Sequence, residues 1–127
     1  MKGLLIKSPH IENIIEGRKT WEIRGSKSKE LNNEIGLIKS GSGLVVGKCK
    51  IIAVHGPLTR ADFEKNTDKH LVESSRIDEV LARYKTCYAW ELADISKLKL
   101  PVPYKHPNGA VIWTMLDDSV SKQVEQQ

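Results

Sequence analysis

The stretch LVVGKCKIIAV, residues 44–54, constrains the fold more than any other part of this sequence. It is rich in β-branched residues, which favour a pleated strand. Gly56-Pro57 follows it closely, and the strand has to end there because proline cannot donate to a strand ladder. SGSG at 40–43 permits a tight connection to an earlier strand over 35–39. The sequence therefore predicts a β-hairpin near its middle.

Helices are expected on both sides of this hairpin. Ser8-Pro9 is a favourable helix start, with Ser as N-cap and Pro in the first position. Gly17 can close that helix in a left-handed conformation. Capping signals precede two further helices: Thr59 and Asp62 ahead of 61–71, and Ser75 and Asp78 ahead of 77–84.

The remaining pattern predicts short strands and a proline-rich connection. The strands are expected over 3–6, 19–24, 87–93 and 110–116, and the connection over 100–109. The resulting order, β-α-β-β-β-α-α-β-β, predicts an α+β fold: a small mixed β-barrel of about five to six strands with two to three short helices. We expect a single domain over 1–117, followed by a polar, frayed tail over 118–127.

The composition of the 127 residues is that of an ordinary globular domain, with 39% apolar and 28% charged residues. The sequence has no uninterrupted run of about 18 apolar residues, the length needed to span a bilayer. MKGLLIKSPH, at the start, has too short an apolar core for a secretory signal, so a cytoplasmic location is expected. Cys49 and Cys87 are expected to be reduced packing residues. The four histidines lack metal-ligand spacing, so neither a metal nor another cofactor is expected.

Positive charge is concentrated in the first half of the chain. Residues 1–60 hold 11 Lys and Arg against 5 Asp and Glu, whereas residues 61–127 hold 9 against 11. A basic half of this kind is compatible with a phosphate-bearing partner or a small anionic ligand.

Residues 17–25, GRKTWEIRG, combine charges of both signs with one large aromatic ring. Strand alternation divides them into two faces: Thr20, Glu22 and Arg24 on one, and Lys19, Trp21 and Ile23 on the other. A lysine on an otherwise apolar face requires either a partner or a function. We expect this strand to line a cleft for a flat, polar ligand with an anionic group.

The segment LLIKSPHIENIIEGRKTWEIRG, residues 4–25, resembles the signature of the ASCH domain family, a branch of the PUA-like β-barrel superfamily. That signature has an apolar-Lys start, a short helix and then Gly-x-Lys-x-x-Glu-x-Arg. Other segments resemble small bacterial single-domain members: IKSG at 38–41, HGPL at 55–58, YAW at 88–90 and PYKHPNGAVIW at 103–113. The resemblance implies a PUA-like barrel with a cleft at one side, a fold associated with RNA and modified bases.

The resemblance also bears on chemistry. One group of ASCH proteins removes the acetyl group of N4-acetylcytidine with a Lys, a Thr nucleophile and a Glu. Lys19 and Arg24 match the motif of that group, but the nucleophile position falls on Glu22. Some ASCH proteins also suggest ribonuclease-like cleavage.

Lys19 and Glu22 are the candidate catalytic residues, and each has a simpler interpretation. Lys19 acts as a base or activates a nucleophile, or it only forms an ion pair with Glu22 or Glu16. Glu22 accepts hydrogen bonds from the exocyclic amine of a base, acts as a general acid or base, or only neutralises Arg24.

Other side chains are expected to complete a ligand-binding cleft. Trp21 would stack on a base, while Arg24 and the lysines would contact phosphate. Trp113 lies in an apolar run and is expected in the core. The expected ligand-binding residues are Lys7, Trp21, Arg24, Lys39, Tyr88 and His106.

Three functions are compatible with these patterns. The first is a binding module for RNA or a nucleotide, with no membrane partner. The second is a hydrolase that uses Lys19, either an amidohydrolase acting on N4-acetylcytidine-like nucleosides or a ribonuclease-like enzyme. The third is a small-molecule sensor.

Overall fold

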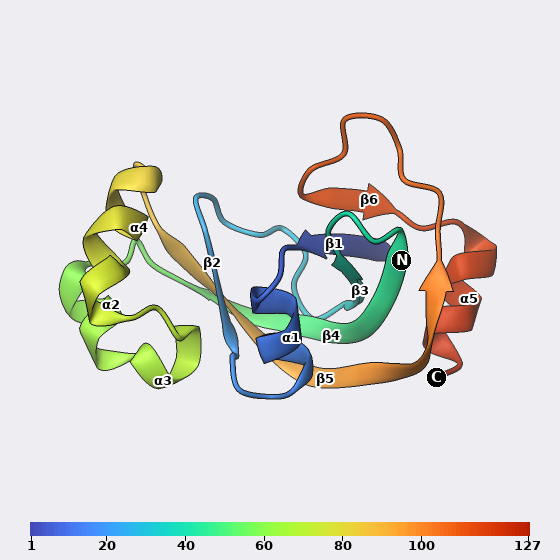
Figure 1. Ribbon diagram of the computed structural model, residues 1–127, viewed down its shortest axis with the longest axis horizontal. Helices are drawn as coiled ribbons and strands as arrows, with labels where there is room; N and C mark the ends of the chain where they lie inside the picture. Colours follow the sequence, from blue (N-terminus) through green and yellow to red (C-terminus); the bar gives the residue numbers. More distant parts are fainter.

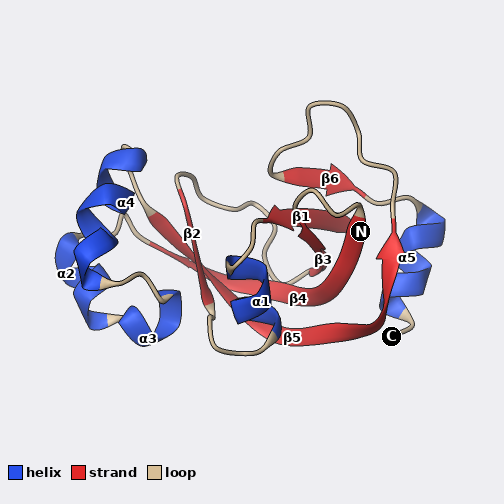
Figure 2. Ribbon diagram, in the orientation of Figure 1, coloured by secondary structure: helices blue, strands red, loops and turns tan.

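The computed structural model describes residues 1–127 and shows one curled sheet with helices around it (Figure 1 and Figure 2). The six strands lie in the order β2-β5-β4-β3-β1-β6. β1 and β3 are parallel, and all other neighbouring strands are antiparallel. The edge strands β2 and β6 do not pair with each other, so the sheet is an open half-barrel.

The elements confirm the expected α+β class, with more helices than the two to three expected. In chain order they are β1 (Lys2–Ile6), α1 (His10–Ile15), β2 (Trp21–Arg24), β3 (Glu34–Lys39), β4 (Leu44–His55), α2 (Arg60–Lys65), α3 (Thr67–His70), the 3-10 helix η1 (Ser74–Arg76), α4 (Ile77–Arg83), β5 (Tyr88–Pro103), β6 (Trp113–Met115) and α5 (Asp118–Glu125). None of the helices has both the length and the apolar character needed to cross a membrane.

Alternation along β1 explains how the two faces of the sheet are covered. Leu4 and Ile6 pack with Ile11 and Ile14 of α1, whereas Leu5 belongs to the cluster that includes α5. Successive side chains of a strand point to opposite faces, so helices on both sides are needed to bury β1. α1 is therefore held against the sheet directly before the chain enters β2.

The C-terminal segment is not a frayed tail. Asp117 caps α5 by accepting a hydrogen bond from the Val120 amide at 2.8 Å. Val120 and Val124, four residues apart, are buried against the sheet. The Gln127 side chain then exchanges two hydrogen bonds with the Leu100 backbone, each 2.9 Å. Two well-placed valines and a cap are enough to dock this helix because β5 extends far enough to receive it.

Several boundaries differ from the sequence prediction. β5 continues through Pro101 to Pro103, where it still pairs with β4, although 100–109 was expected to be a connection. The first helix begins at His10 with Pro9 as N-cap, and Ser8 bonds to the Glu12 side chain instead of capping the backbone. β6 has three residues instead of the seven of 110–116.

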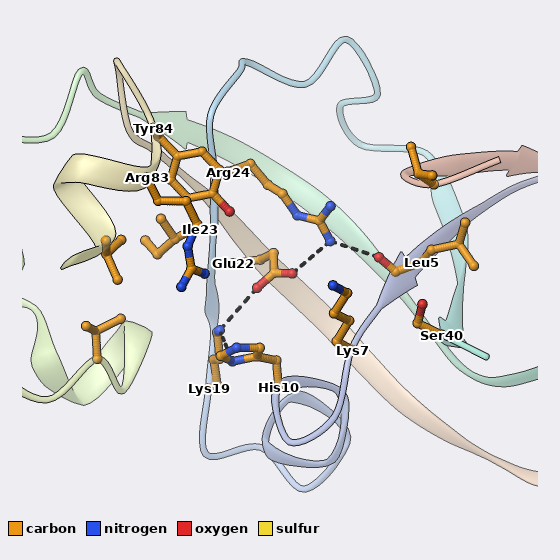
Figure 3. Close-up of a pocket in the computed structure, with 13 residues that line it drawn as sticks. Leu5, Lys7, His10, Lys19, Glu22, Ile23, Arg24, Ser40, Arg83 and Tyr84 are labelled. Atoms are coloured by element: carbon orange, nitrogen blue, oxygen red, sulfur yellow. Dashed lines mark hydrogen bonds and ion pairs between the residues drawn. The ribbon is translucent and has the colours of Figure 1, made fainter. Parts of the chain in front are cut away.

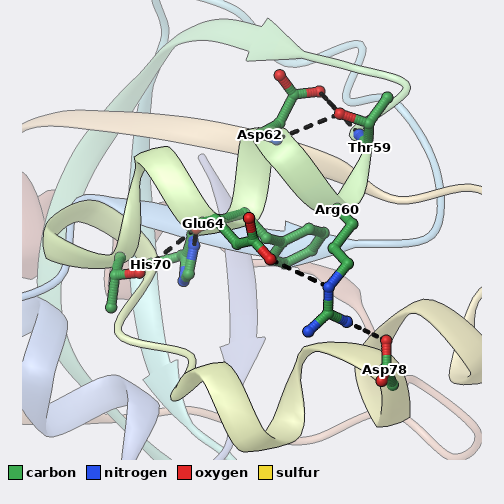
Figure 4. Close-up of polar contacts among 8 residues, drawn as sticks. Thr59, Arg60, Asp62, Glu64, His70 and Asp78 are labelled. Carbon is green, nitrogen blue, oxygen red and sulfur yellow. Dashed lines mark hydrogen bonds and ion pairs between the residues drawn. The ribbon is translucent and has the colours of Figure 1, made fainter.

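Helices α2 to α4 form a separate layer beside β2 (Figure 1). The predicted capping box is present, with the Thr59 amide donating to Asp62 and the Asp62 amide donating to Thr59 (Figure 4). The helix expected over 61–71 is interrupted at Asn66, which separates α2 from α3. Ser75 does not cap α4, which continues directly from η1. The layer and the strands β2 and β5 share one apolar cluster: Trp21, Ile23, Leu58, Phe63, Ile77, Val80, Cys87 and Ala89.

Cys49 and Cys87 are both buried and both free, as expected of packing residues. Burial raises the pKa of the Cys49 thiol to about 12 and also raises that of Cys87. Both side chains are therefore neutral, unreactive thiols at physiological pH.

Candidate functional site

A cavity of about 550 Å³ lies between the α2–α4 layer and the elements β1, α1 and β2 (Figure 3). We refer to it as the β2 pocket. Its lining combines charged, polar and apolar side chains from segments far apart in the sequence: Leu5, Lys7, His10, Lys19, Glu22, Ile23, Arg24, Ser40, Val72, Val80, Arg83, Tyr84 and Val111.

The turn between α1 and β2 directs Lys19 into this pocket. Gly17 adopts a left-handed conformation with φ of 80°, as expected at the end of a helix. The amides of Arg18 and Lys19 then both donate to the Asn13 carbonyl, at 2.9 and 3.0 Å. Lys19 therefore precedes the strand and does not follow its alternation.

Glu22 lies at the floor of the β2 pocket between two cations (Figure 3). Its Oε1 is 3.1 Å from the Lys19 ammonium, and its Oε2 accepts a hydrogen bond from Arg24 at 2.9 Å. The side chains of Lys19 and Glu22 are only 2% and 6% exposed. Arg24 also donates to the Leu5 carbonyl at 2.9 Å, which ties β2 to β1. This triad, with Lys19 and Glu22 buried and Arg24 partly exposed, is a rigid element because each charged group is held by at least two partners.

The charges of the triad determine the ionisation of Glu22. Burial on its own would raise the pKa of Glu22, but the nearby charges of Lys19 and Arg24 outweigh it, and the pKa is lowered. The carboxylate is therefore ionised at physiological pH.

His10, at the start of α1, is the second partner of the Lys19 side chain. The Lys19 ammonium is 3.0 Å from the His10 Nδ1, which must therefore be the unprotonated acceptor. Burial and the charge of Lys19 lower the pKa of His10. The ring is therefore neutral at physiological pH, and its Nε2–H, which has no partner within the protein, remains available as a donor at this lining residue of the pocket.

The mouth of the pocket is more accessible than its floor. Lys7 and Arg83 are exposed, and in Figure 3 their side chains extend toward the space around Glu22. Tyr84 contributes an aromatic ring, which can approach the end of β2 because Gly25 has no side chain. A Cβ at Gly25 would lie 2.7 Å from the Tyr84 Cδ1. The pocket thus offers a cationic mouth, one flat ring and a rigid polar floor.

Four of the eight residues proposed from the sequence lie in the β2 pocket: Lys7, Lys19, Glu22 and Arg24. Lys19 and Glu22 form the ion pair that was one of the interpretations considered for them. Arg24 is the second cation on Glu22, so neutralisation by Arg24, the third interpretation of Glu22, also matches the geometry.

Trp21 is not placed to stack on a ligand in this pocket. It is 6% exposed and packs in the apolar cluster under α2–α4. Its ring stacks on His55, with centroids 4.8 Å apart, and the Lys69 ammonium lies 5.1 Å from its ring centroid. The helical layer covers this face of β2, which the strand pattern does not reveal.

Lys39, Tyr88 and His106 also lie outside the β2 pocket. Lys39 pairs with Glu12 on the other side of α1, at 3.3 Å. Tyr88 is partly buried against the main core, with the Lys27 ammonium 5.9 Å from its ring centroid. The His106 ring is exposed and bonded to the Tyr104 hydroxyl at 2.8 Å.

His10, Arg83 and Tyr84 also line the pocket, and they were not among the residues expected from the sequence. His10 follows Ser8-Pro9 at the start of a helix, and its closeness to Lys19 depends on the sharp turn after Gly17. Arg83 and Tyr84 lie on a helix that was expected only to pack on the core. No local signal connects them with β2.

The structure contains no group of three or more His, Cys, Asp or Glu side chains that could hold a metal ion. The polar groups of the β2 pocket are mainly cations and hydrogen-bond donors. Such a site suits an anionic ligand.

Comparisons with known proteins agree with this fold. The family model described as the ASCH domain matches residues 4–102. The crystal structure of ASCH from Zymomonas mobilis superposes with a TM-score of 0.76 at 13% identity, covering 98% of this chain and 93% of that one. Two mutants of the same Zymomonas mobilis protein give TM-scores of 0.74 and 0.73, each at 13% identity, covering 98% of this chain and 94% and 96% of theirs. No curated protein sequence matches the chain.

Proposed function

We propose that this chain, which belongs to the ASCH domain family, binds a nucleotide or a single-stranded RNA segment in the β2 pocket. The observation that carries the proposal is the Lys19–Glu22–Arg24 triad, with its buried carboxylate, beneath a pocket whose mouth has two further cations. A rigid polar floor fixes the pocket, and the exposed cations at the mouth can contact phosphate. Such ligands are abundant in the cytoplasm, where we expect the protein to act.

The nature of the ligand follows from the two kinds of lining. Arg24, Lys7 and Arg83 can donate to phosphate oxygens. Tyr84 and the apolar side chains near it offer a surface for a flat base, as in single-strand RNA recognition. Double-stranded RNA is a poorer candidate, because its bases are stacked and not available to a pocket of this size.

The geometry favours binding over hydrolysis. Nucleophilic catalysis requires a hydroxyl, thiol or activated water beside a base. The hydroxyl-bearing residues of the pocket are Ser40 and Tyr84, and neither is hydrogen-bonded to Lys19 or His10. Glu22 occupies the position of the nucleophile in the amidohydrolase motif, and a carboxylate held by two cations is a weak nucleophile.

The binding proposal is tested by fluorescence anisotropy with a labelled, short single-stranded RNA. Because bound phosphates release counterions, we expect the affinity to fall steeply between about 50 and 200 mM salt. The double variant Lys7→Ala/Arg83→Ala should bind at least about tenfold more weakly. The control is Lys99→Ala, which removes an exposed charge from β5 outside the pocket. Absence of RNA and nucleotide binding, or an equal loss in the control, would refute the proposal.

Two results of a parallel assay would replace the proposed function with one of the alternatives. Stabilisation by mononucleotides without any RNA binding would make the protein a small-molecule sensor, the third function considered above. Release of acetate from N4-acetylcytidine, abolished in Lys19→Ala, would establish the hydrolase alternative and overturn a function limited to binding.

A further inference from the structure

The hydrogen-bonding groups at the polar end of the β2 pocket are almost all donors. Glu22 is the one carboxylate there, and both of its oxygens are already bonded to cations. Arg24 uses only its Nη2 within the protein, so its Nε and Nη1 remain available. The Nε2–H of the neutral His10 ring has no partner within the protein, and the Lys7 ammonium forms no hydrogen bond or ion pair. A ligand group at this end must therefore supply acceptors, which argues against Glu22 as the reader of an exocyclic amine.

The charge of the pocket exceeds that of a single phosphodiester. Lys7, Lys19, Arg24 and Arg83 line it, whereas Glu22 is the only acidic residue in the lining. Glu79 lies outside but bonds to Arg83 at 3.3 Å, so it compensates one more cation. Two positive charges remain. An internal phosphodiester carries one negative charge, whereas a terminal phosphate monoester carries about 1.5 to 2 at neutral pH.

The two ends of the pocket differ in polarity. Lys7 and Ser40 lie on the β1 and β3 side, whereas Tyr84 and Arg83 lie toward α4 (Figure 3). The apolar lining near α4 comprises Ile23, Val72 and Val80, which pack in or against the apolar cluster of the helical layer. A ligand with an anionic group at one end and a flat, weakly polar group at the other would match both.

From this arrangement we propose that the β2 pocket recognises a terminal phosphate monoester, that of a nucleoside monophosphate or of a phosphorylated RNA end. The phosphate lies among Lys7, Arg24 and the His10 Nε2–H, and the base lies against Tyr84. Glu22 holds Lys19 and Arg24 in place and does not contact the base. This inference rests on the proposed function and adds which group of the ligand is selected.

The test compares three short RNAs of one sequence, with a 5′-phosphate, with a 3′-phosphate, or with hydroxyl groups at both ends. We expect one of the phosphorylated RNAs to bind about tenfold more tightly than the unphosphorylated RNA, because the monoester adds a charge and charge-assisted hydrogen bonds. The preferred end gives the direction in which the strand leaves the pocket. Uridine monophosphate should likewise raise the melting temperature more than uridine does.

A variant comparison shows whether the preference arises in the pocket. Lys7→Met retains the length of the side chain without its charge, and it should reduce the preference for the phosphorylated RNA to about twofold or less. Lys99→Met, the matched control on β5, should leave the preference unchanged. Far-UV circular dichroism and the melting temperature establish that both variants are folded.

The outcomes separate this inference from the function on which it rests. Equal binding of all three RNAs, with a loss of affinity in Lys7→Met, would overturn the terminal-phosphate inference and leave the RNA-binding function intact. A phosphate preference that persists in Lys7→Met would place the selective site elsewhere and also overturn the inference. Binding of none of the RNAs and of no nucleotide would refute the proposed function itself.

Discussion

The two sides of helix α1 carry similar ion pairs in different surroundings. On the β2 side, Lys19 and Glu22 are 3.1 Å apart with side chains 2% and 6% exposed. On the β3 side, Lys39 and Glu12 are 3.3 Å apart with side chains 47% and 40% exposed. The second pair borders a hollow of about 170 Å³, against about 550 Å³ for the β2 pocket.

The Lys19–Glu22 and Lys39–Glu12 pairs differ in their expected contribution to stability because only the first is buried. The exposed pair is screened by water and salt, and its long side chains are free to separate. The buried pair has further partners in His10 and Arg24, and its charges cannot be left uncompensated. Charge pattern alone therefore does not identify a site: Lys19 and Lys39 were both expected to line the cleft, and only Lys19 does.

The largest expected effect comes from neutralising the buried carboxylate. Glu22→Gln would leave Lys19 and Arg24 without their counter-charge, so we expect the free energy of unfolding to fall by roughly 3–5 kcal/mol. Urea denaturation at neutral pH measures this change. Glu12→Gln is the matched control, and its effect should be far smaller because the pair is exposed. Equal effects of the two substitutions would contradict the contrast drawn between them.

The pH dependence of stability should reflect the shifted pKa values of His10, His70 and Glu22. The pKa values of His10 and His70 are lowered from 6.5, mainly by burial. The unfolded chain therefore binds protons more readily, and stability begins to fall below pH 6.5. The pKa of Glu22 is lowered from 4.5, so its contribution is fully present above pH 4.5 and is lost as the pH falls through the folded-state value.

Urea midpoints measured across the acid range test this prediction. One group can change the stability by at most about 1.4 kcal/mol per pH unit. In Glu22→Gln the loss below pH 4.5 should become shallower, while the loss that begins below pH 6.5 is retained. An unchanged acid profile would show that Lys19 and Arg24 do not lower the pKa of Glu22 in the folded protein.

The two sides of α1 should also differ in their effect on ligand binding. Lys7→Ala, in the β2 pocket, should weaken RNA binding about tenfold. Lys39→Ala, on the other side of α1, should change it by less than about twofold. Anisotropy titrations with one RNA measure both. A larger loss in Lys39→Ala would move the binding surface to the β3 side of the helix.

The smallest expected effect concerns the ion pairs on the outer surface of the helical layer. Arg60 bonds to Glu64 at 3.0 Å and also to Asp78, which links α2 with α4 (Figure 4). These groups are exposed, so Arg60→Ala should lower the free energy of unfolding by less than about 1 kcal/mol. A loss comparable to that of Glu22→Gln would show that the layer depends on this link more than its exposure suggests.

Much of the fold could be predicted from local patterns. The strand 44–54, the hairpin glycines and the Thr59–Asp62 capping box each act over a few residues, and all three are present. The docked helix α5 was missed because two valines become an apolar face only when β5 extends to meet them. The extension of β5 through two prolines depends in turn on pairing with β4.

The site could be predicted only in part. Glu22 and Arg24 share one face of β2, so strand alternation was sufficient to bring them together. Lys19 was expected on the opposite face, and it joins them only because the turn after Gly17 places it ahead of the strand. Arg83 and Tyr84 reach the pocket through the packing of α4 on β2, which no local pattern encodes. The same packing buries Trp21, whose ring was expected to be open to a ligand.

If the β2 pocket is the ligand-binding site of this protein, a bound RNA should perturb its lining residues. Amide NMR spectra of the labelled chain, recorded during titration with a short single-stranded RNA, show this residue by residue. We predict shifts concentrated at Lys7, His10, Arg24, Arg83 and Tyr84, with little change at Lys39 or His106. Shifts concentrated around Lys39 and Glu12 on the opposite side of α1, with the β2 pocket unaffected, would contradict a binding site in the β2 pocket.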